Sequence, residues 1–253
     1  MHDSKRRLKR LASLAAGAAV VLVPAAPAAA APAPVTCGAV LTASTTLHAD
    51  LICTGDALVI GADGITLNLG GHTVRGSGTG TGIGISTRTN ITVKNGTVSG
   101  FRSGAEVDGG SSFVTFTRVA LSAGALTVDE STDVTFTHGS LGAVTAIDAN
   151  RVTVTHSQVS GGFLDFVSTI TPVLTHDTIT DAPMNLSEVA DAVISDCVLV
   201  RSQILIGITD KSVVRHNRIS GAANGVYIQD SADHISVLDN TFENNQVGTT
   251  VKT

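Results

Sequence analysis

Three stretches of the chain read almost alike: VTFTRVAL at Val114–Leu121, VTFTHGSL at Val134–Leu141 and VTVTHSQV at Val152–Val159. Apolar and polar residues alternate in each, as in a β-strand with one buried face. Weaker copies occur on both sides of these three. The second inward-facing residue falls at positions 93, 116, 136, 154, 174, 194, 214 and 237, in steps of 23, 20, 18, 20, 20, 20 and 23.

Steps near twenty residues are too short for a unit of strand, helix and strand, which needs about thirty. They suit a coil of three short strands that pairs with the coils before and after it. We therefore predict an all-β fold, a single-stranded right-handed parallel β-helix (a solenoid) of about nine coils. An antiparallel sandwich could also be built from short strands, but it does not require the same residue class at near-constant spacing.

The residue that follows the polar end of each motif is expected to form a corner in the left-handed conformation, which Gly, Asn and Asp tolerate. These corner positions are Gly96, Gly139, Ser157, Asp177, Cys197, Asn217 and Asn240. Cys197 is the exception in this series, and we expect slight strain or a different corner there.

The first residues predict export. Five basic side chains between Lys5 and Arg10 precede a short apolar run and a series of alanines, as in a secretory signal peptide. We divide the chain into a signal peptide (1–31), an N-terminal capping segment (32–56) and the β-helix (57–253), and expect the protein to be secreted. No later segment is long and apolar enough to span a membrane.

The net charge limits the possible partners of the protein, and the positions of its cysteines suggest a disulfide. The whole chain has a formal net charge of −5, and removing residues 1–31 leaves 11 basic against 20 acidic groups, or −9. This balance argues against a nucleic-acid partner, which requires a basic surface. Of the three cysteines, Cys37 and Cys53 lie near the start of the mature chain, and Cys197 is distant. A Cys37–Cys53 disulfide is the economical pairing in an oxidising compartment.

The segment ITLNLGGHTVRG at Ile65–Gly76 resembles the opening coil of bacterial exported right-handed β-helix repeat proteins of the pectin-lyase-like superfamily. Cys37-Gly38 and Leu51–Cys53 resemble that group's first coil, and the resemblance covers about residues 36–250. It implies a fold shared by polysaccharide lyases, glycoside hydrolases, sugar epimerases and proteins with no assigned reaction. The chain lacks the Arg-x-Pro-x-x-Arg element of pectate lyases and the Asn-Thr-Asp element of polygalacturonases. No catalytic residue is carried over from the superfamily.

A column of carboxylates is the first candidate site. Asp108, Asp129 and Asp148 each follow an apolar residue at the end of a strand in three successive coils. Stacking would hold them about 4.8 Å apart, where like charges favour a shared proton or a bound cation. The column could therefore catalyse acid–base chemistry on a glycosidic bond or bind Ca²⁺. The alternative is a solvated acidic stripe without function.

Two further rows share a repeat position. His138, His156, His176 and His216 could hold Zn²⁺ or Cu²⁺, or could simply form a polar ladder at a strand end. Thr-x-Thr pairs form the second row, which resembles the surfaces of ice-binding β-solenoids, although Thr is also a common strand residue. The pairs are Thr115/Thr117, Thr135/Thr137 and Thr153/Thr155, with Thr92 and Thr175 at the margins.

We interpret the chain as a secreted β-helix protein that interacts with carbohydrate or serves as a structural or surface protein. Coil steps of 18 to 23 leave short turns, whereas an enzyme cleft needs longer ones to exclude water. A polysaccharide lyase or glycoside hydrolase acting at the Asp column is the alternative, and an ice-binding Thr array is another. An extracellular polysaccharide is the expected partner, Ca²⁺ the expected cofactor if there is one, and end-to-end self-association through unpaired strand edges is a further expectation.

Overall fold

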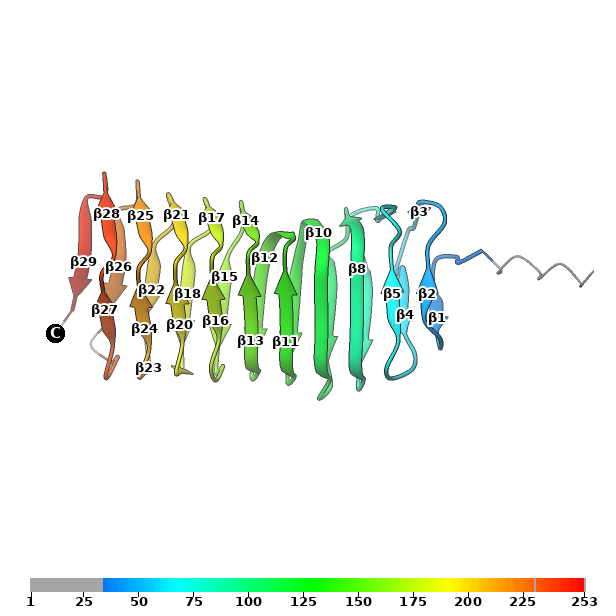
Figure 1. Ribbon diagram of the computed structural model, residues 1–253, viewed down its shortest axis with the longest axis horizontal. Coiled ribbons are helices and arrows are strands. Elements are labelled where there is room, and N and C mark those ends of the chain that lie inside the picture. The colour runs from blue at the N-terminus through cyan, green and yellow to red at the C-terminus, as the bar shows by residue number, and fades with distance from the viewer. Residues whose placement is uncertain (1–33, 230, 253) are drawn as a thin grey trace, which may run out of the picture. The chain divides into compact units, whose positions relative to one another are not determined.

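In a computed structural model, residues 34–229 and 231–252 are described. They form β-strands that stack side by side along one axis, each strand parallel to its partner on the next coil (Figure 1). The predicted signal peptide, residues 1–31, lies outside the described residues. Within the described residues, no helix has the length and apolarity needed to cross a membrane.

The strands line three faces, which we call first, second and third in chain order within a coil. The long strands β8 (Thr89–Ser99), β10 (Ser112–Asp129) and β12 (Ser140–Ile147) run round a corner and contribute to more than one face. The other strands of the first face are β1 (Ala39–Leu41), β4 (Leu58–Ile60), β7 (Thr81–Ser86), β9 (Ser103–Asp108), β15 (Leu164–Val167), β18 (Met184–Ser187), β22 (Ile204–Ile206), β26 (Asn224–Ile228) and β29 (Val247–Val251).

The remaining strands complete the second and third faces. The second face also holds β2 (Thr45–Thr46), β5 (Thr66–Asn68), β11 (Thr132–Thr137), β13 (Asn150–Thr155), β16 (Val173–Thr175), β20 (Val193–Ser195), β24 (Val213–Arg215) and β27 (Ser236–Leu238). The third face also holds β3 (Leu51–Ile52), β6 (Thr73–Arg75), β14 (Gln158–Ser160), β17 (Thr178–Thr180), β21 (Val198–Val200), β25 (Arg218–Ser220) and β28 (Thr241–Glu243). The short strands β19 (Val189–Ala190) and β23 (Thr209–Asp210) pair separately between the first and second faces.

The predicted fold is confirmed, with about 11 turns rather than about nine. The lower number arose because the repeat was recognised mainly from residue 93 onward. The segment predicted as a cap already carries strands: β1, β2 and β3 pair in parallel with β4, β5 and β6 of the next coil. Residues 39–52 therefore form a first coil. Its sequence matches the repeat motif less closely than the later coils do, so the repeat did not predict it.

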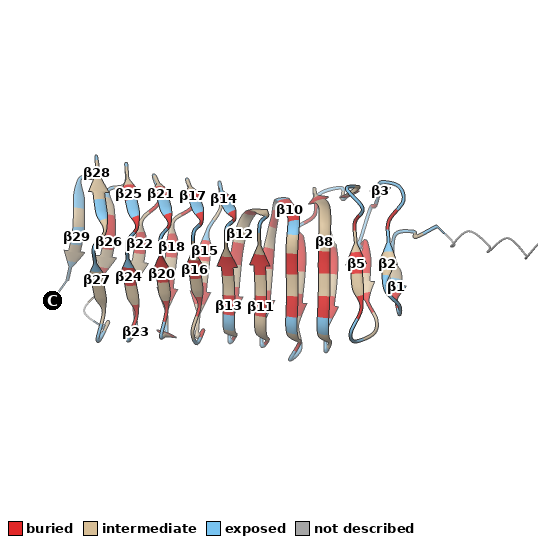
Figure 2. Cartoon of the chain, viewed as in Figure 1, coloured by how far each residue is buried: buried red, intermediate tan, exposed pale blue. Residues whose placement is uncertain are grey.

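The inward row of the second face lies where the repeat predicts. Its residues pair in register from coil to coil and are fully buried: Val93, Phe116, Phe136, Val154, Leu174, Ile194 and Val214. Figure 2 shows buried segments repeating at the same level of successive strands. The rings of Phe116 and Phe136 stack with centroids 6.1 Å apart. Burial of this continuous column is the main stabilisation that a strand gains by stacking.

The left-handed corner between the second and third faces lies one residue earlier than predicted. Positive φ values of 52–59° occur at Asn95, Arg118, His138, His156, His176, Asp196, His216 and Asp239. Asn, Asp and His are the non-glycine residues that adopt this conformation most readily, which accounts for most of the series. The next residue, such as Asp177 or Cys197, instead lies buried inside the corner. Cys197 has no positive φ, because Asp196 is the left-handed residue there; of the two alternatives expected at Cys197, the corner differs and the strain is absent.

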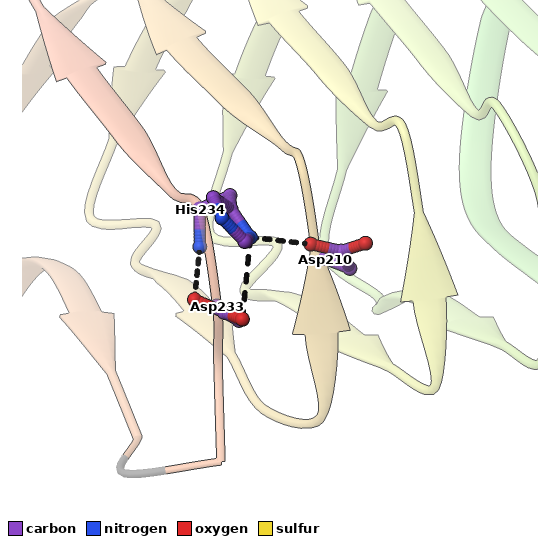
Figure 3. A group of neighbouring side chains, drawn as sticks. All are labelled: Asp210, Asp233 and His234. Carbon is purple, nitrogen blue, oxygen red and sulfur yellow. Dashed lines mark hydrogen bonds and ion pairs between the residues drawn. The ribbon is translucent and has the colours of Figure 1, made fainter.

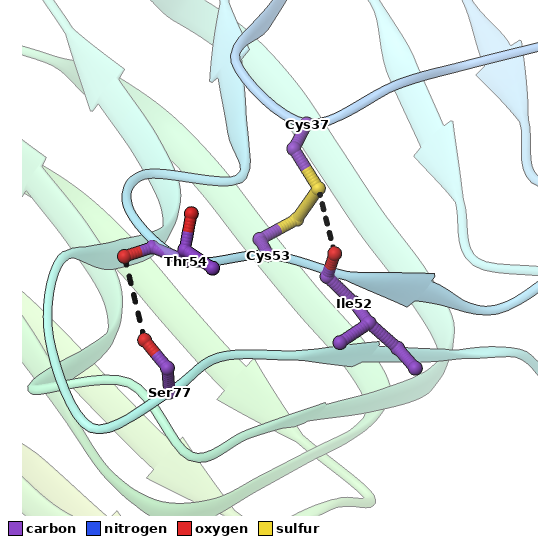
Figure 4. The surroundings of a disulfide bond; sticks show 5 residues. All are labelled: Cys37, Ile52, Cys53, Thr54 and Ser77. Carbon is purple, nitrogen blue, oxygen red and sulfur yellow. Dashed lines mark hydrogen bonds between the residues drawn. A yellow bond between two sulfur atoms is a disulfide. The ribbon is translucent and has the colours of Figure 1, made fainter.

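The predicted disulfide is confirmed. Cys37 and Cys53 are bonded, with their Cα atoms 5.6 Å apart, and Cys197 is a buried free thiol (Figure 4). The bond ties the chain before β1 to the end of β3. Beside it, the hydroxyl of Ser77 donates to the carbonyl oxygen of Thr54 at 3.3 Å, so the next coil is also anchored at this point.

Candidate functional site

The predicted Asp column is only partly formed. Val107 pairs with Val128, so the residues that follow them, Asp108 and Asp129, occupy neighbouring positions. Asp129, however, pairs with Ile147 rather than with Asp148. Asp148 lies one residue further on, at a left-handed turn. The expected single row of three carboxylates is therefore wrong: the first two share a row and Asp148 does not.

Asp108 borders a cavity on the first face that the repeat did not reveal. The cavity has a volume of about 160 Å³ and lies over β4, β7 and β9. Its polar lining includes Asp56, Glu106 and Asp108. Val59 is its outward apolar side chain, whereas Leu58 and Ile85 border it with their side chains buried in the core. We call it the first-face cavity. It brings three carboxylates together beside the half-buried side chain of Val59.

A glycine creates this cavity. Gly84 lies between Val59 and Glu106 in one outward row of the first face, so no side chain fills the space between them. A Cβ atom at Gly84 would meet its nearest neighbours, the carbonyl oxygen of Leu58 and a methyl group of Val59, at 4.0 Å. The space is therefore open enough to admit a larger side chain or a ligand group.

Hydrogen bonds hold two of the carboxylates in place. The backbone N–H of Thr81 donates to Oδ1 of Asp56 at 2.8 Å, and the Thr81 hydroxyl donates to Oε2 of Glu106 at 3.0 Å. Oδ1 of Asp108 is buried and has no partner among the described residues. A buried oxygen of this kind is costly without a donor. The cavity is thus equipped to accept hydrogen bonds from hydroxyl or amino groups, or to bind a cation through oxygen ligands.

The predicted histidine ladder forms, but its geometry is that of a stack. The ring centroids of His138 and His156 lie 5.1 Å apart, those of His156 and His176 lie 4.8 Å apart, and both pairs are nearly parallel. The coil that follows carries Asp196, so His216 is separated from the stack. Metal ligands converge on one point, whereas these rings lie in a straight row at the corner of successive coils. The row's metal binding stays a prediction.

The threonine pairs also align. Thr115 pairs with Thr135 and Thr135 with Thr153, and the second members of the three pairs form a parallel row beside them. Some of their hydroxyls are already engaged: that of Thr137 lies 2.7 Å from Nδ1 of His138. The register of the array is confirmed, and its ice-binding role stays a prediction.

Sequence reasoning missed the other acidic members of the cavity. Glu106 lies two residues before Asp108 on the same face of β9, so strand alternation could have identified it. Asp56 could not be found this way, because it comes from the turn before β4, two coils earlier. A second group of side chains, Asp210, Asp233 and His234, was also missed because its members come from different coils.

Known proteins share this architecture. The family model described as "Right handed beta helix region" matches residues 81–252. A search of curated proteins finds no match.

Among solved structures, the chain is similar to an endo-xylogalacturonan hydrolase from Aspergillus tubingensis, with a TM-score of 0.55, 12% identity, and coverage of 85% of this chain and 86% of that one. It is also similar to an alginate lyase from Paenibacillus, with a TM-score of 0.54, 10% identity, and coverage of 80% and 91%. PfbA, a surface adhesin of Streptococcus pneumoniae, gives a TM-score of 0.52 at 12% identity, with coverage of 83% and 72%. Identities this low show a shared fold alone and say nothing about the reaction. Because the family model matches more than half of its length, the chain belongs to the right-handed β-helix family.

Proposed function

We propose that this protein is an extracellular carbohydrate-binding protein and that the first-face cavity holds one sugar unit of a polysaccharide. The observation that carries the proposal is the combination of Asp56, Glu106 and Asp108 around a cavity that also exposes the apolar side chain of Val59. The C–H face of a sugar ring can pack on Val59, while its hydroxyl groups donate hydrogen bonds to the carboxylates. A volume of about 160 Å³ suits one ring rather than several.

The outward row of the first face extends the surface beyond the cavity. From Glu106 it continues through Thr127, Thr145, Asp165 and Asn185 on successive coils. These polar side chains repeat at about 4.8 Å along the solenoid axis, the spacing of paired strands. A polysaccharide lying along the axis can therefore make further hydrogen bonds on each side of the anchored sugar. The similarity in fold to a polysaccharide hydrolase, a lyase and an adhesin supports this class of ligand.

The charge of the cavity selects among polysaccharides. Three carboxylates repel an acidic glycan, so the preferred ligand is a neutral polysaccharide or one that carries amino sugars. An acidic glycan becomes a ligand if Ca²⁺ bridges its carboxylates to those of the cavity, and this is the role we propose for Ca²⁺. Here Asp108 would be a calcium ligand together with Glu106 or Asp56. Asp129 and Asp148, from the predicted column, do not line the cavity.

Binding to immobilised glycans tests the proposal. The panel contains neutral, amino-sugar and uronate polysaccharides, each with Ca²⁺ and with a chelator. We expect saturable binding to a neutral or amino-sugar glycan, at least tenfold weaker in Glu106→Gln and in Asp108→Asn. Asp129→Asn is the matched control and should bind as the wild type does, because Asp129 is exposed on the neighbouring coil. Equal binding by all four proteins, or binding to no glycan, would overturn the proposal.

Hydrolysis of the bound glycan is the second candidate function. Glu106 and Asp108 are two residues apart on one face of β9, which places their Cα atoms about 7 Å apart. Carboxyl groups of inverting glycosidases are about 6.5–9.5 Å apart, which leaves room for a water molecule, and side chains that project from Cα atoms this far apart can adopt such a separation. Release of reducing ends, lost in both Glu106→Gln and Asp108→Asn, would establish the reaction. The measurement is made on whichever polysaccharide the protein binds.

We also propose that the protein is secreted and that it associates end to end. We propose that residues 1–31 direct export, which the Cys37–Cys53 disulfide supports because such bonds persist in oxidising compartments. Recovery of the protein from the culture medium, dependent on residues 1–31, tests this. End-to-end association is tested by sedimentation of the purified protein over a range of concentrations.

A further inference from the structure

Three side chains of two adjacent coils converge at the turn between the first and second faces (Figure 3). Asp210 is the last residue of β23, and Asp233 and His234 precede β27 on the next coil. Asp210 and Asp233 are paired as a parallel bridge, so the backbone itself places their side chains next to each other. The three preceding coils carry Asn150, Ile170 and Ala190 in this row, so two carboxylates on adjacent coils first occur at Asp210 and Asp233.

The two carboxylates approach the same ring nitrogen. Nδ1 of His234 lies 3.1 Å from Oδ1 of Asp210 and 3.2 Å from Oδ2 of Asp233. One ligand atom from each residue lies within 4.8 Å of the other two. The arrangement is held by the backbone: the N–H of His234 donates to Oδ1 of Asp233 at 2.9 Å, and the N–H of Asp233 donates to the carbonyl oxygen of Thr209 at 2.8 Å.

His216 also lies near two carboxylates, but their arrangement around its ring differs from that around His234. Its Nδ1 lies 3.9 Å from a carboxylate oxygen of Asp196, and its Nε2 lies 3.6 Å from one of Asp239. The two carboxylates therefore face different nitrogens of the ring. An ion bound to either nitrogen of His216 is close to one carboxylate only, whereas an ion beside Nδ1 of His234 has both within reach.

We propose that Asp210, Asp233 and His234 form a binding site for a first-row divalent transition metal, with Zn²⁺ as the representative ion. Nδ1 of His234 and one oxygen from each carboxylate are its protein ligands, and water completes the coordination. An imidazole nitrogen with carboxylate oxygens is a ligand set for Zn²⁺, whereas Ca²⁺ and Mg²⁺ take oxygen ligands. The three side chains are 45–77% exposed, so the ion reaches them from solvent without any opening of the fold.

Lys211 sets the strength of the site. Its Nζ lies 3.5 Å from Oδ2 of Asp210, while the other oxygen of that carboxylate faces His234. Lys211 therefore leaves the metal-binding oxygen free, but its positive charge repels a cation. The bound ion would join the coil of Asp210 to the coil of Asp233, so metal binding would also stabilise the packing of these two coils.

Calorimetric titration of the whole chain with ZnCl₂ tests the proposal. We expect saturable Zn²⁺ binding that is at least tenfold weaker in His234→Asn and in Asp233→Asn and unchanged in His216→Asn. The asparagine substitutions are matched, because His234 and His216 both have positive φ values, of 49° and 53°, which asparagine tolerates. Lys211→Gln should bind Zn²⁺ more tightly. CaCl₂ should not compete. Zn²⁺ binding that His234→Asn leaves unchanged, or no saturable Zn²⁺ binding by the wild type, would overturn the proposal.

A thermal measurement separates loss of the ligand from loss of the fold. Zn²⁺ should raise the melting temperature of the wild type and of His216→Asn, but not that of His234→Asn. The metal-free variants should give the same circular dichroism spectrum as the wild type, because His234 is an exposed turn residue. An equal rise in all three proteins would place the bound zinc elsewhere and contradict the assignment.

Discussion

The carboxylate of Asp177 lies inside the corner between the second and third faces, where its Oδ1 accepts the backbone N–H of Ser157 at 2.8 Å. Its Oδ2 is buried without a partner among the described residues. Two coils further on, Asn217 occupies the same position and donates its side-chain amide to the carbonyl oxygen of Ile194 at 2.9 Å. A charged Asp177 has no proton to donate in this way. Burial raises the pKa of Asp177 to about 7, although hydrogen bonds from the backbone of Ser157 and Thr175 act in the opposite direction.

This pKa makes the stability of the protein depend on pH. The folded-state pKa of Asp177 lies above its ordinary value of 3.8, so folding favours the protonated carboxyl group. Its contribution is fully present below about pH 4 and is lost as the pH rises through about 7. Asp177→Asn supplies a permanent donor and should remove this part of the pH dependence, with a gain of about 1–3 kcal/mol at pH 8.

Urea unfolding of the wild type and of Asp177→Asn at several pH values measures the effect, because subtracting the two curves cancels the contribution of all other groups. Asn217→Asp is the reverse substitution at the equivalent corner position. It should be destabilised at pH 8 more than at pH 4. A constant difference between wild type and Asp177→Asn from pH 4 to pH 8 contradicts the assigned pKa.

The disulfide should stabilise the first coil locally. The Cys37–Cys53 bond closes a loop with a sequence separation of 16, for which the loss of chain entropy in the unfolded state is worth about 3 kcal/mol. Because each coil of a solenoid contacts only its neighbours, the double variant Cys37→Ser/Cys53→Ser should lose protection near β1–β3 and retain it elsewhere. Hydrogen exchange by mass spectrometry resolves the two regions.

Cys197→Ala controls for the loss of a cysteine outside the disulfide. It leaves the bond intact, so its exchange near β1–β3 should equal that of the wild type. Uniformly faster exchange along the whole chain of the double variant would show that the bond stabilises the fold globally instead.

The stacked phenylalanines give a direct test of the coil register. Phe136 is fully buried in the inward row and packs on Phe116, with Val154 on its other side. Phe136→Ala should cost about 3–5 kcal/mol, the usual range for a large aromatic side chain removed from a core. Thr135→Ala changes the neighbouring outward residue and should cost less than about 1 kcal/mol. Chemical denaturation of the two variants compares them, and equal losses would contradict the inward and outward assignment.

The sequence allowed the inward row to be predicted because the fold repeats one residue class at one position. The same pattern wrongly placed Asp148 in the row of Asp108 and Asp129, because Ile147 resembles an inward apolar residue but is 38% exposed. The coil step that contains Asp148, from position 136 to 154, is 18 residues. Two residues are missing between Leu141 and Ala143, compared with Leu121–Ala125 on the coil before, where the register shifts. The repeat alone does not show where such a deletion falls.

The candidate sites were less predictable for a related reason. The first-face cavity depends on the absence of a side chain at Gly84 and on Asp56, which no repeat position marks. The metal site lies where the last coil step lengthens to 23 residues. That length predicts an excursion near His234, but only the folded coil places its ring beside Asp210 of the preceding one.

Filling the first-face cavity without removing a carboxylate gives the sharpest test of its role. Gly84 lies in a strand without a positive φ, and its Cβ position is 4.0 Å from the nearest atoms, so Gly84→Val should fold normally. Its branched side chain should also favour the strand. The valine would occupy the space between Val59 and Glu106. We expect glycan affinity to fall at least tenfold while the melting temperature stays the same or rises. Thr135→Val places the same side chain at an outward position of β11 on the second face, outside the proposed binding surface, and its affinity should change by less than threefold. If Gly84→Val and Thr135→Val bind the glycan equally well, the glycan does not occupy the cavity, since only the first substitution removes the space that a sugar ring requires.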